Sequence, residues 1–217
     1  STRVKDYDVI VVGGGINGLT AAAYLAKAGL SVAVFEARGQ CGAHCDTIEL
    51  GIPGFLHSTH AAWLVPAMSP AMADLDLEGF GPDLYGTDVL FAKTFRNRKN
   101  VVQALDPAVT QESLARISSR DAKTQATITQ YLGENALDAL EINQQLIFSA
   151  PSAKLLDRLA AFQGGLLDRL GIALSGDDLQ RMTGFEVFEM LYESEEVRTT
   201  PAALGEFTGQ WPLHHRV

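Results

Sequence analysis

Three glycines early in the chain have the spacing of a phosphate-binding turn. They are Gly13, Gly15 and Gly18, in the order Gly-x-Gly-x-x-Gly. In such a turn the first glycine lets the chain reverse, the second lets the backbone approach a pyrophosphate, and the third lets the following helix pack close to the strand. The N-terminus of that helix would offer free N–H groups and the positive end of its dipole to the phosphates.

The residues around these glycines predict the elements that must position them. An apolar strand over residues 9–12 leads into the turn, and a helix rich in alanine and leucine follows over residues 19–28, ending before Gly29. A second strand over residues 31–35 ends in Glu36, where an acid would accept hydrogen bonds from the ribose hydroxyls of an adenosine. Together these features predict a dinucleotide site; a bare strand–helix–strand unit without a ligand is the alternative.

The continuation after the acid resembles one family. Residues 41–47 read CGAHCDT, and the stretch 9–47 resembles the N-terminus of flavoproteins of the phytoene desaturase and amine oxidase superfamily, whose pattern is GxGxxGLxxAxxLxxxGxxVxVxEaxxxxGGxxxT. The positions on the pattern are Leu19, Ala22, Leu25, Gly29, Val32, Val34, Glu36, Gly42 and Thr47. One position departs from it, because Ala43 stands where the family has a second glycine. His44 takes the place of the basic residue that often follows.

The resemblance implies FAD as the cofactor and an α/β fold with a Rossmann-like βαβ unit. It continues more loosely to about residue 150. Residues 53–61, PGFLHSTHA, resemble a family segment that passes beside the isoalloxazine, and later residues resemble the desaturase-like, pyridine nucleotide-disulphide oxidoreductase domain-containing group. The FAD contacts that the resemblance implies are Gly13, Gly15, Ile16, Asn17, Gly18, Glu36, Ala37, Arg38, Gly42, Ala43, His44, Thr47, Ser58, Thr59 and His60.

The sequence indicates no catalytic residue by motif. His57 and His60 are candidates, because imidazole is the side chain whose ordinary pKa lies nearest neutrality, although hydrogen-bonded loop structure is the preferred interpretation of both. Cys41 and Cys45 raise the alternative of a redox disulfide. Disulfide reductases also need a second nucleotide motif, which we do not find, so two reduced thiols beside the cofactor loop are the preferred interpretation. The pair 214–215, His-His, lacks ligand partners at metal-site spacing, and no metal is expected.

Residues after the nucleotide motif predict a second domain. A short helix is expected over 69–77 with Ser69 as its cap, then a hairpin of residues 89–91 and 101–102, and then helices. Ser118-x-x-Asp121 and Ser175-x-x-Asp178 have capping-box spacing, and Ser152 is a further N-cap. One helix carries a leucine stripe over 155–170, interpreted as core rather than as the wall of a substrate tunnel, and a last helix is predicted over 177–192.

The expected domains are residues 1–80, a Rossmann-like segment that binds the ADP moiety of FAD, and residues 81–217, part of a largely helical α+β substrate domain. A net charge of −9 and a pI near 5.0 argue against nucleic acid as a partner. No apolar segment reaches the ~20 residues of a membrane helix, and no signal peptide opens the sequence, so a cytoplasmic protein is expected.

The expected function is that of an FAD-binding subunit of a flavoprotein oxidoreductase, whether dehydrogenase, oxidase or desaturase. Such an enzyme takes a hydride from a C–H or C–N bond of an organic, apolar substrate. A non-catalytic FAD-binding scaffold and a redox-neutral flavoprotein isomerase are open alternatives. Members of the family are longer and return late in the chain to the FAD sheet. Because no such return is found after residue 150, the chain is expected to be either half of a split enzyme or a product cut from a longer precursor. In both cases a second polypeptide is expected to complete both domains in a hetero-oligomer.

Overall fold

The computed structural model describes residues 6–61, 69–81 and 85–200. The chain divides into two compact units, Ser1–Asp83 and Leu84–Val217. The two units are described separately below.

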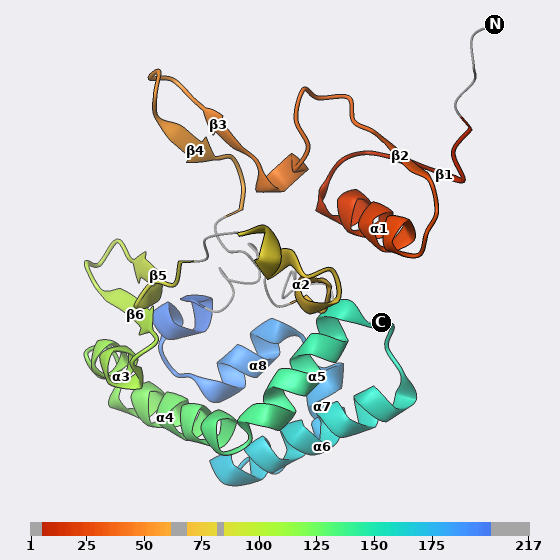
Figure 1. The fold of residues 1–217 in the computed structure, drawn as a ribbon. Helices are drawn as coiled ribbons and strands as arrows, with labels where there is room; N and C mark the ends of the chain where they lie inside the picture. The colour runs from red at the N-terminus through yellow and green to blue at the C-terminus, as the bar shows by residue number, and fades with distance from the viewer. Residues whose placement is uncertain (1–5, 62–68, 82–84, 201–217) are drawn as a thin grey trace, which may run out of the picture. The chain divides into compact units, whose positions relative to one another are not determined.

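The first unit begins with the predicted strand, helix and strand. They are β1 (Val9–Val12), α1 (Ile16–Lys27) and β2 (Val32–Phe35), with β1 and β2 paired in parallel so that Val9 lies opposite Val32 (Figure 1). The helix stops as predicted, because Gly29 takes up the left-handed backbone with φ of 90°. The 3₁₀ helix η1 (Ala43–Cys45), the antiparallel hairpin of β3 (Thr47–Glu49) and β4 (Leu56–Ser58), α2 (Ala71–Asp74) and the 3₁₀ helix η3 (Leu77–Phe80) follow.

The two-stranded sheet has one covered face and one open face. Val11 faces α1, since a Cβ on Gly18 of that helix would lie 3.4 Å from Val11 Cγ1. Side chains alternate along a strand, so Ile10 and Val12 point to the other face, where they are 60% and 86% exposed. Phe35, which pairs with Val12, is 58% exposed. Large apolar side chains therefore cover one side of this sheet without a layer packed on them in the described residues.

Helix α2 is shorter than the predicted helix over 69–77. Ser69 accepts a hydrogen bond from the N–H of Ala71 at 3.2 Å, but the N-cap is Pro70 rather than the predicted Ser69, and the helix ends at Asp74. The carboxylate of Asp74 accepts from the Tyr24 hydroxyl at 2.7 Å, and its backbone carbonyl accepts from the Lys27 ammonium. These bonds fasten α2 to α1.

The second unit contains the predicted hairpin and a set of helices. The elements are β5 (Val89–Thr94), β6 (Asn100–Ala104), α3 (Pro107–Ala115), α4 (Ser119–Glu134), α5 (Ala136–Phe148), α6 (Ala153–Leu170), α7 (Gly176–Arg181) and α8 (Gly184–Leu191), and residues 195–200 are helical (Figure 1). Ser152 caps α6 and Gly171 ends it in the left-handed conformation, both as predicted. The core cluster consists of Val101, Leu114, Ala122, Tyr192 and Val197.

Helix α3 completes the edge of β6 with side chains. Thr110 accepts a hydrogen bond from the N–H of Ala104 at 3.0 Å, and Ser113 accepts from the N–H of Val102 at 2.8 Å. Backbone donors on an edge strand otherwise need a neighbouring strand or water. Side chains of α3 therefore satisfy these backbone donors of β6, so this edge of the sheet needs no further strand.

One of the two predicted capping boxes is wrong. Ser175 and Asp178 form a capping box at α7 as expected. Ser118 does cap α4, but the carboxylate of Asp121 turns inward and accepts from the N–H of Glu193 at 2.8 Å. It also accepts from the N–H of Ser194 at 3.0 Å and from that residue's hydroxyl. The buried carboxylate thus serves donors far along the chain rather than the start of its own helix.

The single helix predicted over 177–192 is also wrong. The chain is extended at Met182, with ψ of 150°, and a new helix, α8, begins after Thr183. Thr183 and Glu186 form a capping box that starts α8. The apolar residues on both sides keep a helical spacing across the break, which hides it from a periodicity argument.

None of the helices in the described part of the chain is long and apolar enough to cross a membrane.

Replacing Asp121 with alanine should destabilise the second unit. The N–H groups of Glu193 and Ser194 would lose their acceptor inside the protein, and a buried donor without a partner costs about 1–3 kcal/mol. We expect the free energy of unfolding in urea to fall by roughly 3 kcal/mol. Asp157→Ala, at an exposed position of α6, is the control and should change it by less than about 0.5 kcal/mol. Equal effects of the two substitutions would contradict the role given to Asp121.

Candidate dinucleotide site

The glycine-rich turn depends on close backbone contacts. Gly13 has φ of 101°, a conformation that favours glycine, and it reverses the chain after β1. A Cβ on Gly18 would lie only 2.2 Å from the carbonyl oxygen of Gly13, so a side chain there would push α1 away from the strand. These are the places of the first and third glycines of the predicted motif.

A second glycine turn lies directly against the first. The N–H of Gly42 donates to the carbonyl oxygen of Gly14 at 2.9 Å, and Gly15 and Gly42 form an isolated parallel β-bridge. A Cβ on Gly14 would lie 2.6 Å from Cys41 Sγ and 3.2 Å from Glu36 Cβ, so a side chain there would have to displace one of its neighbours. Gly14 is absent from the predicted site, because the motif leaves its position free. The run of three glycines at 13–15 is the signal that could have identified it.

Glu36 follows β2 and fastens the turn. Its Oε2 accepts from the N–H of Gly14 at 2.6 Å, and its Oε1 accepts from the N–H of Arg38 at 2.9 Å. These two N–H groups, that of Arg38 first, lower the pKa of the Glu36 carboxyl and keep it ionised. Each carboxylate oxygen has a further lone pair, so the group can still accept from a ribose hydroxyl.

A buried carboxylate joins three segments beside the turn. Asp46 is 4% exposed, and it accepts hydrogen bonds from the Arg38 guanidinium and the Thr59 hydroxyl. The Thr59 hydroxyl first, and Arg38 second, hold the pKa of the Asp46 carboxyl below its ordinary value. Arg38 and Thr59 belong to the predicted site, but Asp46 does not. No motif position marks it, and its partners lie outside its own turn.

Ala43, at the position where the family pattern has glycine, adopts a left-handed backbone conformation that favours glycine. Its φ is 51°, and Gly42 before it has φ of 124°. The Arg38 guanidinium also donates to the carbonyl oxygen of Ala43 at 3.4 Å. A Cβ on Gly15 would meet Ala43 Cβ at 3.3 Å, so Gly15 keeps a narrow space open beside this loop.

Two of the three histidines in this unit stack on each other. The rings of His44 and His60 lie with their centroids 4.5 Å apart, and the N–H of Ala61 donates to the carbonyl oxygen of His44 at 3.2 Å. His57 is exposed in β4, paired with Ile48. The structure therefore brings His44 and His60 together and leaves His57 outside the stack.

The remaining predicted contacts lie on the elements around this turn. Ile16 and Asn17 open α1, whose N-cap Gly15 provides no side-chain hydrogen bond, so the first N–H groups are left for a ligand. Ala37 follows Glu36 and is exposed. Thr47 begins β3 opposite Ser58 of β4, and the Ser58 hydroxyl donates to the carbonyl oxygen of Ala61 at 3.0 Å.

The thiols and acids near the turn form neither a disulfide nor a metal cluster. Cys41 and Cys45 are free and exposed. Within the ranges that the structure describes, no group of histidine, cysteine and acidic side chains is arranged to hold a metal ion. The site therefore consists of backbone donors, one uncapped helix end and two anchored carboxylates. It can hold a diphosphate at α1 and hydroxyl groups at Glu36.

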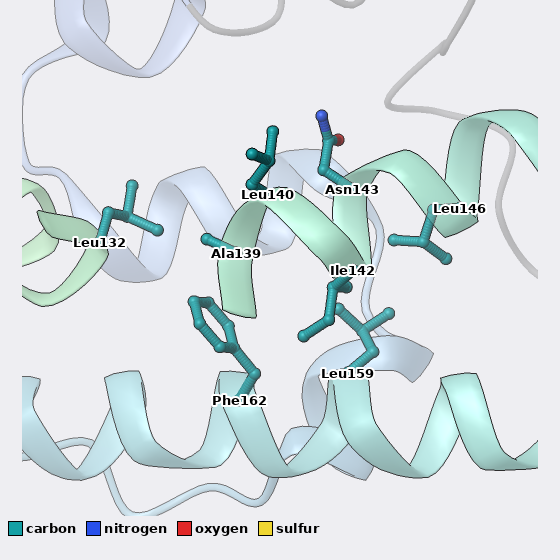
Figure 2. Close-up of a pocket in the computed structure, with 8 residues that line it drawn as sticks. All are labelled: Leu132, Ala139, Leu140, Ile142, Asn143, Leu146, Leu159 and Phe162. Atoms are coloured by element: carbon teal, nitrogen blue, oxygen red, sulfur yellow. The ribbon is translucent and has the colours of Figure 1, made fainter. Parts of the chain in front are cut away.

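A separate cavity lies in the helical unit. It has a volume of about 440 Å³ and is lined by apolar side chains of α4, α5 and α6 together with one amide (Figure 2). Leu159 and Phe162, two residues of the predicted leucine stripe, point into it from α6, whereas Leu155 and Leu167 are buried. The stripe thus contributes both to the core and to a cavity wall.

Comparison with known proteins identifies the first unit. Residues 11–75 match the NAD(P)-binding Rossmann-like domain family. The N-terminal part of this chain is a Rossmann-like dinucleotide-binding domain. This Rossmann-like domain agrees with the predicted fold class.

Relatives of the chain carry oxidoreductase names. The mouse pyridine nucleotide-disulfide oxidoreductase domain-containing protein 2 is 33% identical over 177 residues, which are 77% of this chain and 29% of the relative. A limonene dehydrogenase component of Castellaniella defragrans is 37% identical over 123 residues, 56% of this chain and 22% of the relative. These sequence matches confirm the resemblance stated from the motifs. A putrescine oxidase structure covers 91% of this chain and 36% of its own, with 23% identity and a TM-score of 0.44. The chain spans about a third or less of these proteins.

Two helical glycines provide a test of the close contact at the turn. Gly18→Ala should destabilise the first unit by about 2–3 kcal/mol, because the new Cβ overlaps the carbonyl oxygen of Gly13. Gly133→Ala in α4 has nothing within 4 Å of the added Cβ and should stabilise the second unit by about 0.5–1 kcal/mol. Urea unfolding, followed separately for each unit by hydrogen exchange, measures both. Stabilisation by Gly18→Ala would contradict the contact.

Proposed function

We propose that this chain carries the ADP-binding part of an FAD-dependent oxidoreductase. The observation that supports it most is the loop 41–46 lying on the glycine-rich turn, held by the Gly42 N–H bond to Gly14 at 2.9 Å. A plain NAD site needs the first turn and the acid but no such second turn. FAD, when bound, accepts a hydride from a C–H or C–N bond of the substrate.

The chain's own residues would bind and orient the cofactor. The first N–H groups of α1, at Ile16 and Asn17, face the pyrophosphate, and Gly15 lets it come close to the backbone. Glu36 accepts from the adenosine ribose, with Arg38 near the same half of the cofactor. The family resemblance assigns the flavin end to Thr47, Ser58, Thr59 and His60. No described residue is given the role of acid or base.

The proposed substrate is an organic, apolar molecule. The support is the cavity of about 440 Å³ in the helical unit, whose lining is mainly apolar. The relative named as part of a limonene dehydrogenase acts, by its name, on a compound of this kind. The cytoplasmic location expected from the sequence stays a prediction.

We further propose that another polypeptide completes both units. The support is the exposed apolar face of the β1–β2 sheet, with Val12 86% exposed, since parallel sheets are buried on both faces. The limonene dehydrogenase relative is named as a subunit. A non-catalytic FAD-binding scaffold, the alternative suggested by Ala43, stays open. The isomerase alternative would use the same site.

Replacing Gly15 with valine should abolish FAD binding. The valine side chain would stand in the approach of the pyrophosphate and would crowd Ala43, whose Cβ lies 3.3 Å from the position of a Cβ on Gly15. Gly39→Val, in the same unit with nothing within 4 Å, is the control and should keep its flavin. Flavin content is measured by absorbance on the complete protein. Full flavin content in Gly15→Val would overturn the proposed cofactor site.

Expression of this chain without the completing polypeptide should give insoluble or flavin-free protein. Co-expression should restore a yellow complex, because an interface of the obligate kind buries more than ~2,000 Å² of mainly apolar surface. Native mass spectrometry of the complex reports the partner's mass and the bound FAD together. A monodisperse, FAD-loaded and catalytically active 23.3 kDa monomer would contradict the proposed partner.

A further inference from the structure

The loop beside the glycine-rich turn contains a backbone conformation that needs support. Ala43 has φ of 51°, which is unfavourable for a residue with a Cβ. Such a residue keeps a left-handed conformation only where its surroundings determine it. The family that the sequence resembles has glycine here, which would need no such support.

The contacts that surround Ala43 lead back to one carboxylate. Its carbonyl oxygen accepts from the Arg38 guanidinium at 3.4 Å, and the same guanidinium is paired with Asp46. The Asp46 side chain is 1% exposed, whereas that of Arg38 is 49% exposed. The buried acid therefore determines where the longer and more exposed side chain lies.

Asp46 also reaches the segment after β4. It accepts from the hydroxyl of Thr59, which lies within 3.4 Å of Nδ1 of His60. His60 in turn stacks on His44, one residue from Ala43. The Asp46 carboxylate thus connects Arg38, the loop that contains Ala43, and the segment after the β3–β4 hairpin.

We propose that Asp46 is a positioning residue for the dinucleotide. By holding Arg38 and Thr59 it keeps Ala43 in the left-handed turn and keeps the loop 41–46 on the glycine-rich turn. The Asp46–Arg38–Thr59 cluster compensates for the glycine absent at position 43. This inference rests on the proposed function for the identity of the ligand as FAD, but not for the state of the loop.

The first test measures FAD affinity of the complete protein by flavin fluorescence. Asp46→Asn keeps the shape of the side chain but removes its charge, and should weaken binding roughly 10-fold or more. Glu49→Gln, an exposed acid in β3, is the matched control and should leave affinity unchanged. In an Ala43→Gly background the loss caused by Asp46→Asn should be at least about threefold smaller, because glycine needs less support.

The second test needs no flavin. Hydrogen–deuterium exchange of the FAD-free protein reports the N–H groups of Gly42 and Cys45, which donate to Gly14 and Gly42 at 2.9 Å. Asp46→Asn should speed their exchange, and adding Ala43→Gly should slow it again. Thr59→Val removes one partner of Asp46 and leaves Arg38, so it should give a smaller increase. If the Asp46→Asn protein does not fold, the Thr59→Val protein takes its place in this test.

The outcomes separate the two proposals. Wild-type protein that binds no FAD but shows the expected exchange pattern would overturn the proposed function and support the cluster. Unchanged affinity and unchanged exchange in Asp46→Asn would overturn the positioning role. If Asp46→Asn weakened FAD binding equally with alanine and with glycine at position 43, Asp46 would act only on general stability. That result would also overturn the positioning role.

Discussion

The dinucleotide unit depends on two backbone turns that touch without a side chain between them. Gly14 uses both of its polar groups there: its N–H donates to Glu36 at 2.6 Å, and its carbonyl oxygen accepts from Gly42 at 2.9 Å. Cys41 Sγ occupies the space where a Cβ would stand. The bond between the two turns is therefore made by backbone groups alone, the Gly42 N–H and the Gly14 carbonyl oxygen. Gly14 therefore holds both Glu36 and the loop 41–46 in place.

The parts of this structure that could be predicted are those decided by neighbours in the sequence. The order of strand, turn, helix and strand follows from glycine conformations and apolar periodicity, and the ends of α6 follow from Ser152 and Gly171. Asp46 and Asp121 could not be predicted in the same way. Their partners Thr59 and Glu193 lie far along the chain, and a short pattern carries no information about a fold-dependent partner.

The break between α7 and α8 shows how two local signals can compete. Periodic apolar residues favour a continuous helix, and the Thr183–Glu186 capping box favours a new start. The backbone is extended at Met182, and the Thr183 hydroxyl accepts from the N–H of Glu186, which a continuous helix would have paired internally. A similar ambiguity applies at the start of α4. Ser118 caps the helix, but the carboxylate of Asp121 accepts a hydrogen bond from the distant N–H of Ser194 instead of completing a capping box.

Both units present apolar surfaces of a kind that proteins cover. In the first unit the exposed face includes Ile10 and Phe35, and in the second Leu137 of α5 is 85% exposed. A strand pair covered by helix on one side only is half of the arrangement that parallel sheets adopt. Covering the open face would give the β1–β2 sheet its second layer, so the proposed partner and the cofactor site depend on the same small sheet. The Asp46–Arg38–Thr59 cluster acts on that site from within the first unit, through the loop that lies on the glycine-rich turn.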